Sequence, residues 1–588
     1  MRITTKKTAL FLVLVFALGV PVGADEVSQP DTPDLQGRAK LALSFLTKSC
    51  DPQRGGLPLW WGKFNLDQPA LWHENHIYMQ TAGLWTDAVV LMRHMTGDTQ
   101  HAELQAKLGN LLLSYYDPED GFVHQEKRED QPVQDNVPIQ SMSYSLKGMV
   151  TLYAATKDQR VKAYIDRLIG GLSKIMIKKD DYWYFPSLGY SRSSGWSSQE
   201  EPPVEGWPLG AAGHCIFYLR PLSRYAHLTG DPTARELADN MFNWILFHSG
   251  TRFGIDKPIQ GILVTNTWAA NAALYHAHWT GRQDLKDWAI QAFQVAQKKG
   301  TRFGWFPEFD SNYVCEGGET CPLVDMIEIA ITLALAGQNE YWDVAEKYGR
   351  NQLLEHQMLH TDWFENIRPI AERRPGNSPP GGRTENVLEM LPGGFAGWSA
   401  PNDFFGCSSV NANFMKQGCC DVQGARGLYL LWHHAIRELE NGVWIDLLFS
   451  RSSRSVDVHS HLPYEGQIDL HVHLPQPMYV RIPGHVDRTQ VSVKINGQTQ
   501  PVEWQKGYVH LKHLTPDARV EITFPLAISK TREIAQRSGF QVVWKGNTVV
   551  SIDPPGAVYP LYARQGFLSG PAPRTTRSAY VPEKSLKP

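Results

Sequence analysis

The chain has 588 residues, of which 42% are hydrophobic and 20% are charged, an ordinary globular composition. This length suits roughly two to four domains and excludes a small disulfide-stapled scaffold. Lysine and arginine number 57 against 60 aspartate and glutamate residues, a formal net charge of -3, so no global positive field favours nucleic acid as a partner. The 19 Trp and 22 Tyr residues are compatible with sugar binding, and equally with a large helical core.

The first residues predict a signal peptide. Three basic residues precede an apolar run at 9–20, and small residues follow at 22–24, the pattern of a cleaved signal at 1–24. The apolar run is short for a membrane span, and no later stretch offers about 18 uninterrupted apolar residues. We therefore expect an exported protein, periplasmic or secreted, without a membrane span.

Residues 25–440 predict a helical domain. Apolar residues return at three- and four-residue steps, which is the period of an amphipathic helix. Similar helix-ending turns recur at Gly97, Lys157, Gly230, Gly281 and Gly337. The spacing of these turns is about one helical hairpin plus a loop. Recurrent hairpins predict a toroid of paired helices whose long loops gather around one cavity.

Residues 441–568 predict an antiparallel β-sandwich. Short alternating segments such as QIDLHVHLP and VSVKING are joined by turns containing Asn-Gly, Lys-Gly or Pro, as in sandwich domains. The tail at 569–588 has little apolar content, so we expect it to be extended or disordered.

Two short motifs predict a metal site, and each opens an apolar helix. Glu319 and Cys321 are two residues apart, and Cys419 and Cys420 are adjacent, a spacing that strains a disulfide between them. Three sulfurs and one carboxylate suit tetrahedral Zn²⁺ better than harder metals. A Cys-Cys pair alone is more often a chance or structural feature, so the prediction depends on the combination of ETC with GCC.

These motifs resemble those of the β-L-arabinofuranosidases and their relatives. The resemblance covers nearly the whole mature chain and includes sandwich strands at 479–484 and 493–497. It implies an (α/α)6 barrel followed by a sandwich, with zinc held by Glu319, Cys321, Cys419 and Cys420. It also implies that the thiolate of Cys419 is the catalytic nucleophile of a retaining glycosidase.

The resemblance implies a Glu acid/base on the loop before the ETC motif. Glu308 is the nearest match, 11 residues before Glu319, and Glu316 is the competing candidate. The family commonly has a third cysteine where this chain has Gln417, and Cys407 is a more distant thiol that either touches the metal or is simply buried. These departures predict a divergent branch whose substrate need not be β-L-arabinofuranoside.

Other polar and aromatic residues are candidates for sugar contacts. For each one the competing explanation is capping or core packing, because a helical barrel must satisfy many inward polar groups. The predicted substrate-binding residues are His73, His76, His214 and Trp268, and further tryptophans in loop-like segments are Trp60, Trp61, Trp196, Trp207 and Trp398.

The leading hypothesis is an exported, exo-acting retaining glycoside hydrolase for β-L-arabinofuranosides or related sugars of plant or microbial glycans. One alternative is a barrel enzyme, either another glycosidase or a polysaccharide lyase, that uses paired carboxylates. Another is a non-catalytic carbohydrate-binding protein with a structural zinc. A homodimer is a further expectation. The carboxylates available to the paired-carboxylate enzyme are Glu74, Asp135, Glu205 and Glu308.

Overall fold

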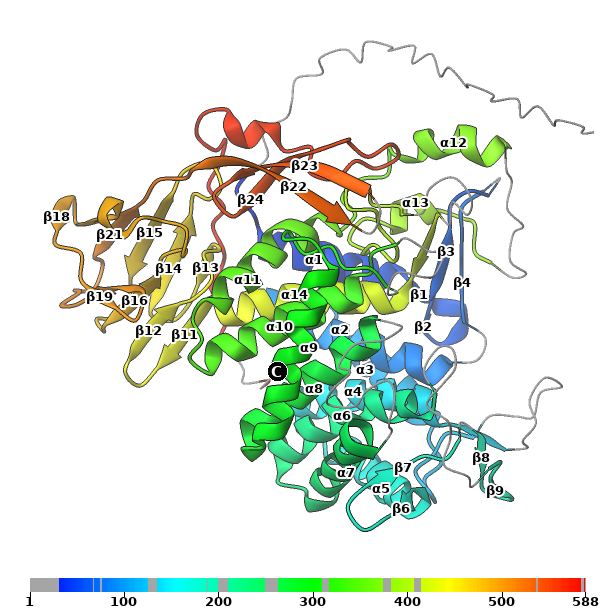
Figure 1. Ribbon diagram of the computed structural model, residues 1–588. Helices are drawn as coiled ribbons and strands as arrows, with labels where there is room; N and C mark the ends of the chain where they lie inside the picture. Colours follow the sequence, from blue (N-terminus) through cyan, green and yellow to red (C-terminus); the bar gives the residue numbers. More distant parts are fainter. Residues whose placement is uncertain are drawn as a thin grey trace, which may run out of the picture.

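A computed structural model gives the fold of the chain. It describes residues 31–588 apart from 67, 75–76, 125–134, 188, 199–209, 249–262, 309–316, 374–381, 407–413, 536–537, 583–585 and 587–588. Two parts are visible in Figure 1: a helical domain that extends to Ala435, and a β-rich C-terminal region that begins with Ile436. The predicted succession of a helical and a β-rich region is thus confirmed. The signal peptide predicted at 1–24 lies outside the described residues.

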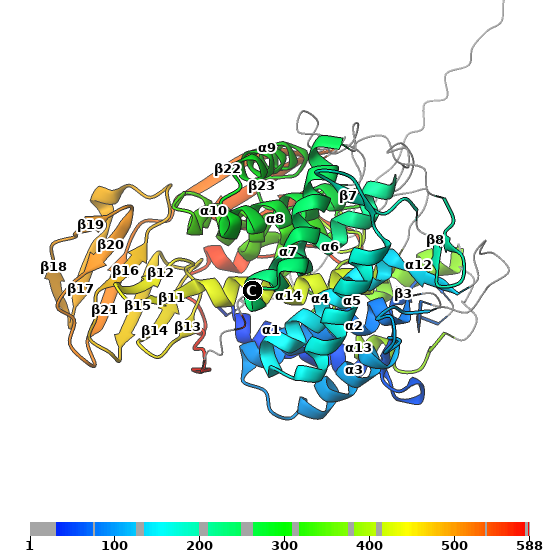
Figure 2. The same cartoon turned by 90° about the horizontal axis from the view of Figure 1, so that it is seen from below.

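Six helices form a closed ring inside the helical domain. Each contacts the next in chain order, and the last contacts the first. The view from below shows these helices with others packed around them (Figure 2). The ring helices are α2 (Tyr78–Thr96), α4 (Ile139–Thr156), α6 (Gly210–Thr229), α8 (Leu263–Thr280), α10 (Thr320–Leu335) and α14 (Gly418–Ala435).

Outer helices cover the ring, and each contacts at least one ring helix. Nearly every residue of α10 is buried, whereas the outer helix α9 buries one face; this amphipathic pattern is the one seen in the sequence. The outer helices are α1 (Leu35–Lys48), α3 (Ala102–Ser114), α5 (Gln159–Ile175), α7 (Pro232–Asn243), α9 (Gln283–Lys299) and α11 (Tyr341–Tyr348). Two short helices, α12 (Phe364–Arg373) and α13 (Val387–Met390), follow.

The predicted helix-ending turns are confirmed. Gly97, Gly230 and Gly281 have φ values of 68°, 75° and 75°, and Lys157 has a φ of 56°. This left-handed conformation closes the end of a helix and is least costly for glycine. The turns let the chain reverse from a ring helix to its outer partner.

The C-terminal region contains two packed sheets with a shared apolar core. Alternate residues of β14 and β15 are buried, which is the period-two pattern expected of a sandwich. One sheet has the order β11 (Ile436–Leu439), β12 (Gly442–Ile445), β16 (Met478–Arg481), β20 (Tyr508–Leu511) and β19 (Trp504–Gln505). The other has the order β13 (Arg451–Ser452), β14 (Val456–Ser460), β15 (Gln467–Val472), β21 (Arg519–Thr523), β17 (Ser492–Ile495) and β18 (Gln498–Gln500).

One strand pair departs from the predicted antiparallel pattern. Strands β12 and β16 run parallel. The chain leaves the first sheet after β12, forms β13 to β15 in the second sheet, and returns at β16. Such a crossover between two sheets allows the returning strand to point in the same direction as the strand beside it.

A third sheet returns to the helical domain. It comprises β22 (Ile528–Ala535), β23 (Ser538–Lys545) and β24 (Thr548–Asp553). Phe540 and Trp544 on this sheet share an apolar cluster with Trp305 and Trp363 of the helical domain. An ion pair of 2.7 Å between the side chains of Arg302 and Glu533 joins the same two regions. The sheet therefore braces the loops that precede α10.

The described part of the tail is extended and attached to the protein. Thr576 donates two hydrogen bonds to Thr32, from its backbone N–H at 2.7 Å and from its hydroxyl at 2.6 Å. Farther along, Val581 and Leu586 are buried against the helical core. The backbone oxygen of Leu586 accepts a hydrogen bond of 3.0 Å from Arg224 of α6. Among the described residues, no helix is long and apolar enough to cross a membrane.

Short strands complete the helical domain. They connect or precede the helices and form small separate sheets. They are β1 (Cys50–Asp51) with β2 (Leu57–Pro58); β10 (Met415–Gln417), β3 (Trp61–Lys63) and β4 (Ala70–Trp72); β5 (Asn136–Pro138), β8 (Gly189–Ser191) and β9 (Gly195–Trp196); and β6 (Ile177–Lys178) with β7 (Trp183–Tyr184).

Candidate metal and active site

The ETC motif lies at the N-terminal end of α10. Glu319 precedes the helix, and Cys321 is its second residue. Isolated bridges pair Gly318 with both Pro307 and Ser399, so three loop segments run side by side here. A Cβ at Gly318 would lie 2.1 Å from Nε1 of Trp305, a spacing that only glycine permits. This close approach fixes where Glu319 leaves the loop.

The GCC motif lies at the N-terminal end of α14. Strand β10 leads into this helix and pairs with β3, with Gln417 opposite Trp61. A Cβ at Gly418 would lie 2.6 Å from Trp60 and 2.8 Å from Trp85, so the aromatic packing requires glycine. Cys419 and Cys420 follow directly and therefore occupy the first turn of the helix.

The four predicted metal ligands are brought together. Their ligand atoms all lie within 4.8 Å of one another. Sγ of Cys420 lies 3.7 Å from Sγ of Cys321, 4.0 Å from Sγ of Cys419 and 3.6 Å from Oε1 of Glu319. All three cysteines are free, and the two sulfur–sulfur distances are far longer than the roughly 2.05 Å of a disulfide.

The geometry fits a tetrahedral zinc ion. Zinc bonds of about 2.3 Å to sulfur and about 2.1 Å to oxygen separate the ligand atoms of a tetrahedron by about 3.6 to 3.8 Å. The distances from Sγ of Cys420 to Sγ of Cys321 and to Oε1 of Glu319 match that range. Sγ of Cys419 lies 4.0 Å from both Sγ of Cys420 and Oε1 of Glu319, which is only slightly longer. The other carboxylate oxygen of Glu319, Oε2, is buried without a hydrogen-bond partner among the described residues. A cation would compensate this buried polar atom.

The four ligands differ in exposure. Glu319, Cys321 and Cys420 are buried, whereas Cys419 is partly exposed. Burial raises the pKa of the three buried groups, because it penalises their charged forms. In contrast, hydrogen bonds from the Cys321 and Cys420 thiols lower the pKa of Cys419 to about 7. Cys419 is therefore both the most accessible of the sulfurs and the one most easily converted to a thiolate.

Gln417 takes part in the ligand environment. Its amide Nε2 donates to Oε1 of Glu319 at 3.3 Å and to Sγ of Cys420 at 3.9 Å. The sequence identified Gln417 only as a departure from the family pattern, and its contacts give it a role as a hydrogen-bond donor to two ligands. Cys407, the other cysteine considered for the metal, lies outside the described residues.

Glu308 lies beside the same cluster. The bridge between Pro307 and Gly318 places its backbone next to the ETC loop, and Glu308 N donates to the Gly317 oxygen at 3.0 Å. The pKa of Glu319 is raised by burial first, then by the charge of Cys420, and then by that of Glu308. A carboxyl group that acts electrostatically on this cluster is well placed for acid/base chemistry. Its competitor, Glu316, lies outside the described residues.

Two stacked tryptophans connect Glu308 to a second carboxylate. The indole of Trp398 donates to Oε2 of Glu308, and the indole of Trp61 donates to Oε2 of Glu74 at 2.6 Å. The two indole rings are nearly parallel, with centroids 6.4 Å apart. Both tryptophans were sugar-stacking candidates from the sequence. The structure adds that each donates a hydrogen bond to a glutamate.

A buried histidine supports the ETC loop from behind. His356 Nδ1 lies 2.9 Å from the hydroxyl of Thr320, and its Nε2 lies 2.8 Å from the hydroxyl of Ser399. Thr320 stands between Glu319 and Cys321, so this contact orients both ligands. Burial lowers the pKa of His356 to about 3, so the ring is neutral and bridges two hydroxyl groups. No motif in the sequence points to this residue, because it lies 36 residues from Thr320 and only the fold brings the two together.

Aromatic and charged residues of the ring lie close to the ligands. The charges of Cys419 and Cys321 add to burial in raising the pKa of Tyr144 on α4. The ring of Tyr144 meets that of Trp268 edge to face, with centroids 5.8 Å apart. Nζ of Lys147 lies 5.2 Å from the Trp268 ring centroid. The predicted substrate residue Trp268 therefore packs against Tyr144, whose pKa is affected by the cysteines, and its Nε1 is buried without a hydrogen-bond partner among the described residues.

Deeper in the ring the polar residues form a buried network. Glu328 accepts hydrogen bonds from Arg220 at 2.6 Å and from Arg426 at 2.9 Å. Asp325, one helical turn after Cys321, accepts a hydrogen bond of 3.0 Å from Thr267. Burial raises the pKa of Asp325 to about 7, and the charge of Glu328 adds to this effect.

The other predicted substrate residues have different positions. His73 is buried, with Nδ1 at 3.0 Å from the Pro58 oxygen and Nε2 at 3.0 Å from Oδ2 of Asp51. Both of its nitrogens are thus engaged within the protein, and its contact with substrate remains a prediction. His214 belongs to α6, but its side chain lies outside the described residues, as does the whole of His76.

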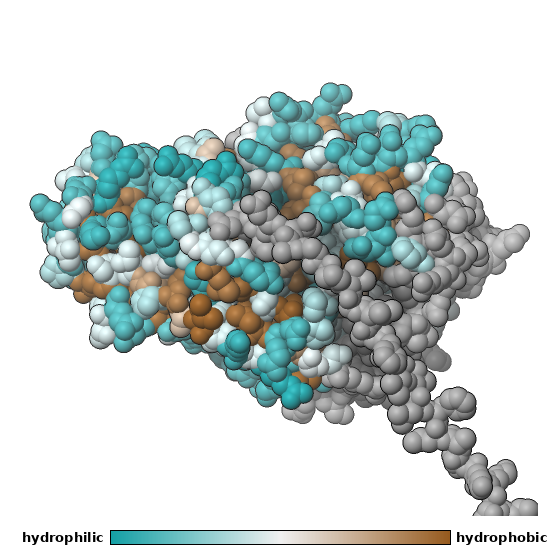
Figure 3. All heavy atoms as spheres, turned by 90° about the horizontal axis from the view of Figure 1, so that it is seen from above, coloured by the Kyte–Doolittle hydropathy of each residue, from teal (hydrophilic) through white to brown (hydrophobic). Residues whose placement is uncertain are grey.

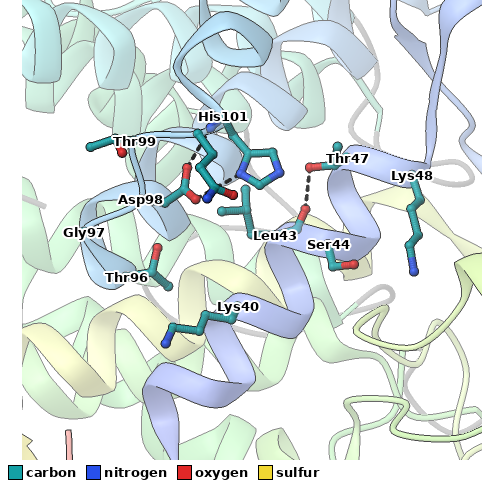
Figure 4. A pocket seen from close by; sticks show the side chains of 11 residues that line it. Lys40, Leu43, Ser44, Thr47, Lys48, Thr96, Gly97, Asp98, Thr99 and His101 are labelled. Atoms are coloured by element: carbon teal, nitrogen blue, oxygen red, sulfur yellow. Dashed lines mark hydrogen bonds and ion pairs between the residues drawn. The ribbon is translucent and has the colours of Figure 1, made fainter. Parts of the chain in front are cut away.

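A separate cavity of about 640 Å³ lies between α1 and the turn after α2. Figure 4 shows Lys40 and Lys48 from α1 around it, with Asp98 and His101 paired on the opposite side. None of the four cysteine-site ligands lines this cavity. It lies at the C-terminal end of α2, whereas the ligands are at the N-terminal ends of α10 and α14.

Comparison with known proteins gives the fold. No protein-family model and no curated protein matches the sequence. Among solved structures, a GH127 β-L-arabinofuranosidase from Geobacillus stearothermophilus T6 has a TM-score of 0.56 at 14% identity, covering 88% of this chain and 80% of its own. In fold, the chain resembles these enzymes. A second GH127 β-arabinofuranosidase has a TM-score of 0.55 at 13% identity, covering 87% of this chain and 79% of its own.

A third structure, described as a glycoside hydrolase, has a TM-score of 0.55 at 11% identity and covers 88% of this chain and 81% of its own. The similarity to GH127 structures across both regions of the chain confirms, at the level of fold, the resemblance inferred from the ETC and GCC motifs. The low identity agrees with a divergent branch.

Proposed function

We propose that this protein is an exported, retaining glycoside hydrolase in which a zinc-bound Cys419 thiolate is the nucleophile and Glu308 is the acid/base. In this proposal the closed ring of helices is an (α/α)6 barrel. The observation that carries it is the convergence of Glu319, Cys321, Cys419 and Cys420 beside Glu308. Cys419 is the partly exposed residue of this group, so it is the one that a substrate would reach in this proposal.

The donor set is suited to zinc and to a thiolate. Zinc held by the three sulfurs and Glu319 would withdraw charge from Cys419 and keep it deprotonated at neutral pH. The first turns of α10 and α14 face the cluster, and their unpaired N–H groups also favour negative charge. The chain thereby holds the Cys419 sulfur in one orientation.

In the first step Cys419 Sγ attacks the anomeric carbon of the sugar. A carbon–sulfur bond forms as the glycosidic carbon–oxygen bond breaks, and the carboxylic acid of Glu308 gives its proton to the leaving oxygen. The indole N–H of Trp398 donates to Glu308, which fixes the direction in which the carboxyl group points.

In the second step water attacks the same carbon. The carboxylate of Glu308 accepts the proton from this water, and the carbon–sulfur bond breaks with its electron pair returning to Cys419. Two inversions at one carbon give overall retention. Trp61 and Trp398 offer flat ring faces beside the carboxylate, so they are the candidates to stack on the sugar.

We infer the substrate class from the fold and from the site. The similar solved structures include β-L-arabinofuranosidases, so β-L-arabinofuranosides and related sugars of plant or microbial glycans are the first substrates to test. We propose exo action on chain ends, which a single thiolate at the end of a pocket would favour. The sequence at 1–24 supports export to the periplasm or outside the cell.

The test combines metal analysis with trapping of the covalent adduct. Purified wild-type protein is assayed on a panel of nitrophenyl furanosides and pyranosides, including the β-L-arabinofuranoside, and its zinc is measured by elemental analysis. Substrate-treated protein is then quenched in acid and digested for mass spectrometry. The expected results are one zinc per chain, release of nitrophenol, and one glycosyl group on Cys419.

Three variants make the test specific. Cys419→Ser is expected to abolish turnover and the adduct. Glu308→Gln is expected to slow turnover while a fluoride-leaving substrate still forms the adduct, because such a leaving group needs little protonation. Cys50→Ser is the matched control, since Cys50 is a free cysteine outside the cluster whose thiol donates to the Leu46 oxygen at 3.3 Å. A Cys419→Ser protein with wild-type activity would contradict the proposal.

A second candidate is favoured by the two tryptophan-held glutamates. If Glu74 and Glu308 act as a carboxylate pair, one protonates the leaving group and the other acts as base or nucleophile. The cysteine cluster would then have only a structural role. In that case Cys419→Ser keeps its activity, whereas Glu74→Gln and Glu308→Gln each lose it.

A further inference from the structure

A second group of metal-binding side chains lies on the sandwich, whereas the cysteine cluster lies in the helical domain. It comprises Asp457, His471 and His473, whose ligand atoms all lie within 4.8 Å of one another. Asp457 is on β14, and the two histidines are on and just after β15. Figure 1 shows these strands in the sandwich, beside the helical domain.

The strand geometry explains why these three side chains converge. His471 and His473 are two residues apart along an extended segment, so both project from the same face of the sheet. Asp457 is the direct cross-strand partner of His471, which brings their side chains together on that face. The alternate residues Val456 and Val472 are fully buried in the sandwich core. The cluster therefore stands on the outward face of a rigid pair of strands.

The distances suit one ion shared by two imidazoles and a carboxylate. Oδ2 of Asp457 lies 3.0 Å from Nε2 of His473 and 3.7 Å from Nδ1 of His471. The two imidazole rings have centroids 4.8 Å apart and planes inclined by 67°. Nitrogens of both imidazoles thus face the same carboxylate oxygen. Without a metal, His473 donates its N–H to Asp457, and a bound divalent ion would replace that proton.

A second carboxylate, that of Asp517, lies where it can orient one of the two histidines. Nε2 of His471, the ring nitrogen that faces away from Asp457, lies 3.5 Å from Oδ1 of Asp517. A carboxylate on the outer nitrogen of a metal-binding histidine fixes its tautomer and orientation. With Nε2 protonated toward Asp517, Nδ1 is left with its lone pair toward Asp457.

The open side of the cluster faces a hollow in the sheet surface. A cavity of about 500 Å³ is lined by Asp457 and His471 and by neighbouring polar residues such as His459, Lys494 and Arg519. The side chains of Asp457, His471 and His473 are 24%, 20% and 35% exposed, so water can complete the coordination. Seen from above, the coloured surface of the protein has hydrophilic side chains (teal) between the hydrophobic ones (brown) (Figure 3).

We propose that Asp457, His471 and His473 form a second divalent-metal site, selective for Zn²⁺ and similar nitrogen-preferring ions over Ca²⁺ and Mg²⁺. Imidazole nitrogens suit zinc, copper and nickel, whereas calcium and magnesium take oxygen ligands. Three protein ligands leave one tetrahedral position to water or to an anionic group, as in open zinc sites. The cluster requires no ligand from the cysteine site, so the inference does not depend on the proposed glycosidase activity.

The test is calorimetric titration of the full-length, untagged protein with zinc chloride. The protein is first stripped of metal and then given one equivalent of zinc, so that the cysteine cluster, with its three thiolates, is filled first. Wild type is expected to bind one further equivalent of Zn²⁺, whereas titration with Ca²⁺ or Mg²⁺ gives no comparable binding. His471→Ala and His473→Ala are each expected to lose this equivalent.

Two further variants separate the site from general surface binding. His461→Ala is the matched control, because both nitrogens of His461 are already engaged, at 2.8 Å with Asp469 and 3.2 Å with Thr575. It should keep the second equivalent. Asp517→Asn removes the supporting carboxylate and is expected to weaken binding roughly 10–100-fold. The proposal is overturned if wild type takes up no further zinc, or if both histidine variants take up as much as wild type.

Discussion

The two groups of metal-binding side chains show opposite ways of building a site. The cysteine cluster joins two helix N-termini about 100 residues apart in the sequence and is largely buried. The histidine cluster joins two adjacent strands and is partly exposed. Water can satisfy exposed donors and acceptors, whereas buried thiols and a carboxylate with an unpaired oxygen need a partner inside the protein. The cysteine cluster should therefore depend on its metal much more strongly.

The largest effects are expected from the buried ligands. Cys321→Ser replaces a soft ligand and should lower zinc content at the cysteine cluster and reduce kcat/KM at least about 10³-fold. Elemental analysis and assays on the active furanoside measure both effects. Cys50→Ser controls for the loss of a thiol elsewhere. A Cys321→Ser protein with full zinc content and activity would show that the cluster is not a metal centre.

The next largest effect is expected from Glu308, the proposed acid/base. It tests whether catalysis takes place at the cysteine cluster. Glu308→Gln is expected to lower kcat by roughly 10²–10⁴-fold. The loss should shrink as the leaving group becomes more acidic, because less proton donation is then needed. Trp398→Phe, which removes the indole donor to Glu308, should lower kcat less and shift the pH profile. A loss independent of the leaving group would argue against acid catalysis by Glu308.

The sequence was informative where residue type alone restricts the chemistry. The ETC and GCC motifs predicted one four-ligand cluster because few functions bring three cysteines and a glutamate to the starts of apolar helices. The helix-ending turns were also predictable, because left-handed residues have strong preferences. In contrast, the contacts of Trp398 and His356 depend on irregular loops, whose paths have no periodic signal in the sequence.

The histidine cluster shows a different limit. The segment containing His471 and His473 was recognisable as a strand, but its alternation was fully explained by a half-buried sheet. The metal-binding hypothesis depends on the strand register that places Asp457 opposite His471. Register is fixed by long-range packing and turn geometry, so a single sequence does not supply it.

A smaller effect is expected from the buried acid beneath the cysteine cluster. Asp325 has a pKa raised to about 7 from the ordinary 3.8, so it binds its proton more tightly in the folded than in the unfolded protein. Its contribution to stability is present below pH 3.8 and is lost as the pH rises through 7. The full loss corresponds to roughly 4 kcal/mol, taking the pKa difference between about 7 and 3.8 at about 1.4 kcal/mol for each pH unit.

Asp325→Asn tests this expectation, because asparagine is neutral at every pH. Between pH 5 and pH 8, wild type should lose stability relative to Asp325→Asn, as followed by urea unfolding at each pH. Asp457→Asn provides the contrast from the sandwich, since Asp457 is partly exposed and its pKa is lowered, with hydrogen bonds from Ser452 and His473 outweighing its burial. Equal pH dependence of wild type and Asp325→Asn would contradict the assignment.

The smallest effect is expected from the hydrogen-bond donor behind the metal ligands. Gln417→Ala removes the amide that donates to Glu319 at 3.3 Å and to Cys420 at 3.9 Å but leaves all four ligands in place. Loss of such a supporting contact typically weakens metal binding by roughly 10–100-fold. Competition with a zinc chelator measures this change. The buried ligands have no water to replace the lost amide. Gln417→Ala should therefore weaken zinc binding at the cysteine cluster more than Asp517→Asn weakens it at the exposed histidine cluster. The reverse order would show that burial does not make the cysteine cluster more dependent on its surroundings.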